Sequence, residues 1–156
     1  MWFDEFKTPI GMLKIAVDEK GLRYILFENN KHEPLRVVDW KKDRSVTHVA
    51  REQLLQYFSG ERNEFELEIS LEGTEFQQRT WRMLAHIPYG QTWSYAELAK
   101  RIDSPKAVRA VGAANGRNPL PILLPCHRVI GSNGSLTGFG GGLPVKQWLL
   151  EHERRA

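Results

Sequence analysis

The single cysteine of the chain, Cys126, stands directly before a histidine and an arginine in the run Pro125-Cys126-His127-Arg128. A thiol is a useful nucleophile only after it loses its proton, and its ordinary pKa is about 8.5. A neighbouring imidazole or cation lowers that pKa, so this run predicts a reactive thiolate. A lone cysteine is more often a small buried apolar residue, and it is the neighbours of Cys126 that favour the nucleophile.

His127 needs help to act as the base for this thiol. Adjacent residues of an extended chain point to opposite faces, so we expect a bound water to relay the proton between Cys126 and His127. The second ring nitrogen of a catalytic histidine is commonly held by a carboxylate. Glu151 and Glu153, near the end of the last predicted helix, are the candidates.

Composition limits the class of protein. The 156 residues suit one compact domain or two small ones, and one cysteine excludes an internal disulfide and fits a reducing compartment. No apolar run is long enough to span a bilayer, and no signal-peptide pattern opens the chain. We therefore expect no membrane partner and a cytoplasmic location, or a nuclear one in a eukaryote.

Charge is distributed unevenly along the chain. Residues 1–76 hold 11 Lys+Arg and 15 Asp+Glu, a net of −4, whereas residues 77–156 hold 11 and 4, a net of +7. The basic half predicts contact with a polyanion. Ordinary scatter of surface charge is the alternative interpretation.

The sequence pattern predicts the α+β class for the whole chain, with a small α/β domain in the first half. Apolar and polar residues alternate in short runs, and one stretch has apolar positions at helical spacing. The pattern predicts strands at 12–17 and 22–27 joined by a turn at 18–21, a helix from Ser45 to Ser59, and a strand at 65–69. No nucleophile or metal cluster stands out here, so residues 1–73 are interpreted as a supporting domain.

The second half, residues 74–156, predicts a mostly helical domain. Helices are expected at 76–86, from a capping box at Ser94 to about residue 102, from a cap at Ser104 to Asn115, and from 143 to 153. Two short helices joined by few residues form a helix-turn-helix. Three prolines predict a stiff, extended segment before Cys126, and a glycine-rich loop follows it.

At these residues the chain resembles the O6-alkylguanine–DNA alkyltransferase family. The resemblance covers about residues 74–153 and rests on Pro125 to Ile130, Arg109 to Gly112, Asn118-Pro119, Gly141 to Leu143, Lys146 and 148–153. It implies a ribonuclease H-like first domain and direct repair of DNA, in which Cys126 takes the alkyl group once and is not regenerated. O6-alkylguanine is the implied lesion, and O4-alkylthymine stays open.

The resemblance also implies roles for individual side chains. His127 activates Cys126 through water, Glu153 holds His127, Asn118 braces the site, and Tyr95 presses on the phosphate as the nucleotide rotates out. The implied DNA contacts are made by Arg109, which fills the vacated place in the stack, and by Ala107, Ala110 and Gly112, which allow close approach to the minor groove. The base pocket is lined by Val129, Ser132, Phe139 and Gly140.

Two positions depart from the family pattern. Phe139 stands where many members have tyrosine, so a hydroxyl contact is lost, and Gly140 leaves only a backbone N–H where some relatives have a polar side chain. No cofactor is implied. The first half has no cysteine, so the structural zinc of some relatives is not expected. The expected partner is double-stranded DNA, bound by a monomer.

Three other functions remain open at this point. A module that binds alkylated DNA without repairing it would lack the acceptor cysteine, which is present here. A cysteine hydrolase would need an oxyanion hole and turnover. A transcription regulator would need a dimerisation or effector segment, and we identify none in the sequence.

Overall fold

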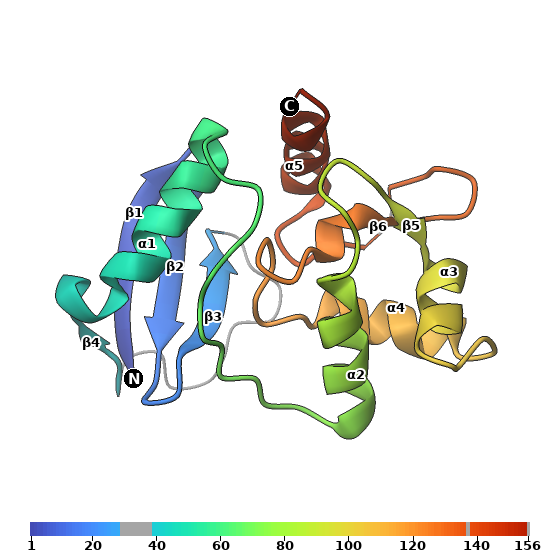
Figure 1. The fold of residues 1–156 in the computed structure, drawn as a ribbon, viewed down its shortest axis with the longest axis horizontal. Helices are drawn as coiled ribbons and strands as arrows, with labels where there is room; N and C mark the ends of the chain where they lie inside the picture. Colours follow the sequence, from blue (N-terminus) through green and yellow to red (C-terminus); the bar gives the residue numbers. More distant parts are fainter. Residues whose placement is uncertain (29–38, 137, 156) are drawn as a thin grey trace.

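The computed structural model describes residues 1–28, 39–136 and 138–155. A sheet with one long helix forms the first half of the chain, and short helices form most of the second half beside it (Figure 1). The predicted α+β class is therefore confirmed.

Four strands form the sheet of the first half: β1 Trp2–Thr8, β2 Gly11–Val17, β3 Leu22–Phe27 and β4 Lys41–Lys42. Their order is β3-β2-β1-β4, with β1, β2 and β3 antiparallel and β4 parallel to β1. The predicted hairpin is confirmed, because the Asp18 N–H donates to the Gly21 carbonyl and Gly21 has a φ of 149°. β1 had not been predicted.

Helix α1, Arg44–Ser59, packs on β1 and β2 and ends at Gly60 in a left-handed conformation, as predicted (Figure 1). Its cap is Asp43 and not Ser45, since the Asp43 carboxylate accepts from the backbone of Ser45 and Val46. A carboxylate two residues before Ser45 accepts from the first free N–H groups, so the helix begins earlier than predicted.

The strand predicted at 65–69 is wrong. Residues 65–68 are not strand, and only an isolated bridge joins Leu22 to Ile69. The Gln53 side chain instead donates to the Glu66 carbonyl and accepts from the Glu66 N–H. These two backbone groups are therefore not available to pair with a neighbouring strand.

The second half contains α2 Glu75–Leu84, β5 Trp93–Ser94, α3 Tyr95–Arg101, α4 Val108–Gly116, the 3-10 turn η2 Cys126–Arg128, β6 Val129–Ile130 and α5 Leu143–Arg154. Ser94 caps α3 as predicted, by accepting from the Glu97 N–H. Helix α4 begins at Val108, later than predicted. Its expected cap, Ser104, instead bonds Arg79 and the Ile102 carbonyl, and a separate turn joins the Ala107 N–H to the Ser104 carbonyl.

The chain before Cys126 is a buried turn and not the extended segment that its prolines predicted. The Leu124 N–H donates to the Leu120 carbonyl, and Ile122 adopts a φ of 76°. A positive φ is unfavourable for a β-branched residue. Cys126 itself opens η2, so the alternating geometry assumed for Cys126 and His127 does not hold.

The two halves share one apolar core. The Ile25 N–H of β3 donates to the Pro119 carbonyl at 2.9 Å, and buried side chains from both halves form one cluster. No helix in the described part of the chain is long and apolar enough to cross a membrane.

Candidate active site

His127 of η2 and Glu153 of α5 form a buried pair. His127 Nε2 lies 2.7 Å from Glu153 Oε2, and both side chains are almost fully buried. The other predicted carboxylate, Glu151, is exposed and accepts from Gln147 at 3.2 Å. The geometry therefore selects Glu153 as the partner of His127.

Glu153 accepts four hydrogen bonds. Arg128 Nε donates to Oε1 at 2.7 Å and Arg128 Nη2 to Oε2 at 2.9 Å, while the Tyr57 hydroxyl donates to Oε2 at 2.7 Å and His127 completes the set. Burial by itself would raise the pKa of Glu153, but the bonds and charges of His127 and Arg128 hold it far below its ordinary value. Glu153 is thus a fixed carboxylate that orients its donors and takes no proton from them.

This arrangement sets the tautomer of His127. A carboxylate only accepts, so Nε2 carries the proton and donates it to Glu153, and Nδ1 carries the free lone pair. Nδ1 is buried and has no hydrogen-bond partner among the described residues. Burial holds the pKa of His127 below its ordinary value, against the opposing effect of Glu153. The ring is therefore a neutral base at neutral pH.

Cys126 is 4% exposed and is not the pre-formed thiolate that the sequence predicts. Burial raises its pKa to about 11, although a hydrogen bond from Asn118 and the charge of Lys146 act in the opposite direction. The prediction is wrong because burial outweighs the hydrogen bond from Asn118 and the charge of Lys146, and a neutral His127 adds no charge to offset it. The thiol rests protonated and needs a base when it reacts.

Asn118 closes the turn that carries Cys126. Its Nδ2 donates to the Leu124 carbonyl at 2.6 Å, and its Oδ1 accepts from the Leu120 N–H at 2.9 Å. Asn115 adds a bond of 3.3 Å to the Cys126 carbonyl. These contacts fix the backbone on both sides of the thiol, which fits the bracing role that the resemblance implies for Asn118.

Lys146 had no role in the sequence prediction beyond its place in the resemblance. It is fully buried, donates from Nζ to the Val129 carbonyl at 2.6 Å, and lies 5.9 Å from the centre of the Tyr95 ring. Burial lowers its pKa to about 8. The helical spacing of α5 could have indicated that Lys146 is buried, because Lys146 and Glu153 share the buried face of this helix with Leu149 and Leu150.

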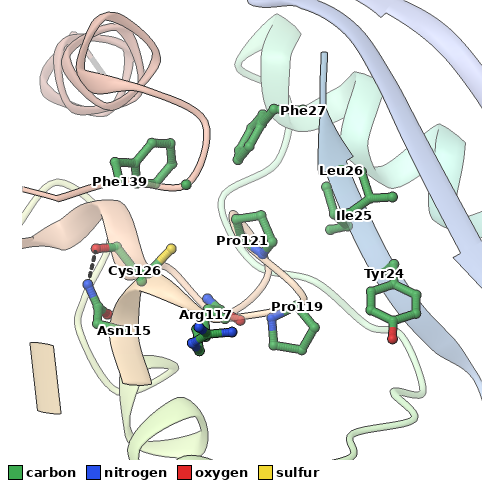
Figure 2. Close-up of a pocket in the computed structure, with 13 residues that line it drawn as sticks. Tyr24, Ile25, Leu26, Phe27, Asn115, Arg117, Pro119, Pro121, Cys126 and Phe139 are labelled. Carbon is green, nitrogen blue, oxygen red and sulfur yellow. Dashed lines mark hydrogen bonds between the residues drawn. The ribbon is translucent and has the colours of Figure 1, made fainter. Parts of the chain in front are cut away.

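A cavity of about 60 Å³ lies beside Cys126, between β3 and the second half. Figure 2 shows the Cys126 sulfur directed toward the space between Phe139 and Pro121. Two of the predicted pocket residues, Phe139 and Gly140, line this cavity, and Phe139 packs on Phe27 of β3 with 5.4 Å between ring centres. The lining does not include Val129, which is buried, or Ser132, which is exposed.

The predicted DNA-contacting residues gather on α3 and α4. Arg109 and Ala110 are exposed, and Ala107 is half-buried just before α4 begins. Gly112 faces Tyr95, since an added Cβ there would lie 3.8 Å from the ring. Within the described residues, no group of three His, Cys, Asp or Glu side chains is placed to hold a metal ion.

Comparison with known proteins shows the family of the chain. Residues 3–71 match the model of the 6-O-methylguanine DNA methyltransferase ribonuclease-like domain, and residues 75–155 match the model of the DNA binding domain of the same protein. The chain belongs to this methyltransferase family. The methylated-DNA–protein-cysteine methyltransferase of Methanosarcina acetivorans is 47% identical over 154 residues, which cover 98% of each chain.

Solved structures of the family have the same fold. The Mycobacterium tuberculosis OGT in complex with DNA is 44% identical, with a TM-score of 0.93 over 99% of this chain and 94% of that one. The O6-methylguanine DNA methyltransferase of Methanococcus jannaschii is 28% identical, with a TM-score of 0.69 over 98% and 94%. The fold therefore extends across both halves of the chain.

Proposed function

We propose that this member of the family repairs DNA by moving the alkyl group of O6-alkylguanine onto Cys126. The observation that carries the assignment is the buried thiol followed directly by a histidine whose Nε2 is held by Glu153 at 2.7 Å. That arrangement leaves a neutral imidazole lone pair as the base for a protonated thiol. A nucleophile and a base beside it are the two groups that a single nucleophilic displacement needs.

The reaction balances with the groups at the site. His127 Nδ1 takes the Cys126 proton through water, the sulfur attacks the alkyl carbon, and the bond from that carbon to guanine O6 breaks. The departing guanine receives a proton, with Tyr95 as the proposed donor, and proton exchange with solvent then returns His127 and Tyr95 to their neutral forms. The product is a thioether, which has no easy route back to a thiol, so each molecule reacts once.

We expect repair to stop at one equivalent of protein. With alkylated duplex in excess, the amount of repaired guanine should rise to a plateau equal to the amount of active protein, because the thioether is not regenerated. The measurement is the amount of guanine released from the lesion over time at several protein concentrations. Continued turnover would instead support a cysteine hydrolase.

We propose that residues 74–156 bind DNA and carry the chemistry, with α3 and α4 acting as a helix-turn-helix in the minor groove. Guanine O6 lies inside the duplex, so the nucleotide must rotate out before sulfur can reach the alkyl carbon. A side chain that enters the vacated place offsets part of that cost. Arg109 is exposed on α4, whose Ala110 and Gly112 add little bulk.

Arg109→Ala should slow repair of duplex DNA about tenfold or more, because the vacated stack is no longer filled and the orphaned cytosine loses a partner. The loss should be smaller on single strands and absent on free O6-benzylguanine, which needs no rotation. Rates of transfer to the three substrates test this. An equal loss on free base and duplex would mean that Arg109 supports the active site itself.

The remaining assignments rest on separate observations. Cys126, His127, Glu153 and Asn118 come from one chain, which supports action as a monomer. The named relatives are bacterial and archaeal, which supports a cytoplasmic location. Cys126 is present, which disfavours a module that only binds lesions.

A further inference from the structure

The relay that activates Cys126 is completed by the first half of the chain. We infer that Tyr57 of α1 is a positioning residue, whose hydroxyl holds the Glu153 carboxylate in the orientation and electrostatic state that keep His127 a neutral, correctly directed base. This inference rests on the proposed function, and it gives the first domain a part in the chemistry beyond support.

The contact is direct and fully buried. The Tyr57 hydroxyl donates to Glu153 Oε2 at 2.7 Å, the same oxygen that lies 2.7 Å from His127 Nε2, and Tyr57 is 0% exposed. The backbone of Tyr57 takes part as well, because its carbonyl accepts from His152 Nε2 at 2.7 Å. Two adjacent residues of α5 are therefore bonded to one residue of α1.

Aromatic packing fixes the ring that carries the hydroxyl. The centres of four neighbouring rings lie between 5.2 and 6.4 Å from that of Tyr57, and they belong to Phe58, Phe65, Tyr89 and His152. A ring held on several sides cannot swing its hydroxyl away from Glu153. Packing therefore fixes the hydrogen bond from the Tyr57 hydroxyl to Glu153, and this donor comes from α1, whereas the other donors come from η2.

The hydroxyl also affects the charge that His127 experiences. Burial and the neighbouring Glu153 charge raise the pKa of Tyr57, so it remains a neutral donor. The titratable and charged groups facing the relay come from four segments: Tyr57 from α1, Tyr89 from the loop after α2, Cys126 and Arg128 from η2, and Lys146 and His152 from α5.

Removal of the hydroxyl leaves Oε2 with more electron density for the His127 N–H. A stronger acceptor favours the charged imidazolium, so the pKa of His127 should rise from its lowered wild-type value. The transfer needs neutral His127, and its rate falls as pH drops through that pKa. The acid limb of the pH–rate profile should therefore move to higher pH in Tyr57→Phe.

The test compares Tyr57→Phe with wild type in transfer from O6-benzylguanine, a substrate that removes DNA binding from the measurement. We expect the rate above the acid limb to fall about tenfold, equivalent to about 1.4 kcal/mol in the barrier, because Glu153 is no longer held from the α1 side. Titration of the His127 ring by NMR should show the raised pKa independently of activity.

Thr47→Val is the matched control, since it removes another fully buried hydroxyl of α1, one that donates to the Asp43 carbonyl at 3.2 Å at the start of the helix. We expect it to match wild type in rate and in acid limb. A Tyr57→Phe variant that melts lower but keeps both the wild-type rate and the wild-type titration of His127 would overturn the inference. A wild-type protein that never alkylates Cys126 would instead overturn the proposed function, and the NMR titration would still decide whether Tyr57 tunes His127.

Discussion

Cys126→Ala is expected to abolish alkyl transfer completely while alkylated DNA still binds. The sulfur is the atom that forms the new bond, whereas the proposed DNA contacts are on α3 and α4. The thiol is 4% exposed and small, so its loss leaves only a minor cavity in the core. Transfer is measured as the amount of guanine released from the lesion, and binding is measured by titration of labelled duplex.

The melting temperature is the control for this variant, because a folded protein is needed to interpret either result. Cys126→Ser is a second variant that keeps the size of the side chain and replaces the sulfur with a weaker nucleophile. Residual transfer in a folded Cys126→Ala protein would show that another group accepts the alkyl group. Loss of binding in both folded variants would show that Cys126 contributes to DNA binding.

Removal of either member of the His127–Glu153 pair should slow transfer about a hundredfold or more, the range typical of a general base. His127→Ala removes the base, and Glu153→Gln removes the charge that orients it and keeps the shape of the side chain. The double variant should be little slower than the worse single one, because the two groups handle one proton. Single-turnover rates on O6-benzylguanine give all three values.

Glu153 needs a stability control because it also neutralises Arg128 in the core at 2.7 Å. Breaking a buried ion pair is destabilising by about 3–5 kcal/mol, so each variant must be shown to be folded at the assay temperature. Glu151→Gln is the matched control, since it changes an exposed carboxylate on the same helix and should leave the rate unchanged. Losses that add fully in the double variant would separate the two roles.

Local patterns predicted most of the elements that position the site. The Ser94 cap, the hairpin turn at Gly21 and the last helix follow from side chains that act on their own neighbours, and the structure contains all three. The signature around Cys126 identified the family, the last predicted helix offered Glu151 and Glu153 as candidate partners for His127, and the resemblance implied Glu153. These features depend on chemistry within a few residues.

The parts that sequence analysis missed depend on contacts between distant segments. Tyr57 bonds Glu153 across 96 positions, and no local pattern marks its hydroxyl as part of the relay. The turn at Ile122 is closed by Asn118, a partner that proline spacing does not indicate. The raised pKa of Cys126 follows from burial, which a run of four residues does not determine.

The most direct test of the account is the intact mass of the wild-type protein after incubation with an oligonucleotide that carries O6-methylguanine, followed by peptide mapping. The account predicts that the whole active population gains a single methyl group, and that the group is located on Cys126. A folded, reduced sample whose mass does not change, or a methyl group on any other residue, would contradict it.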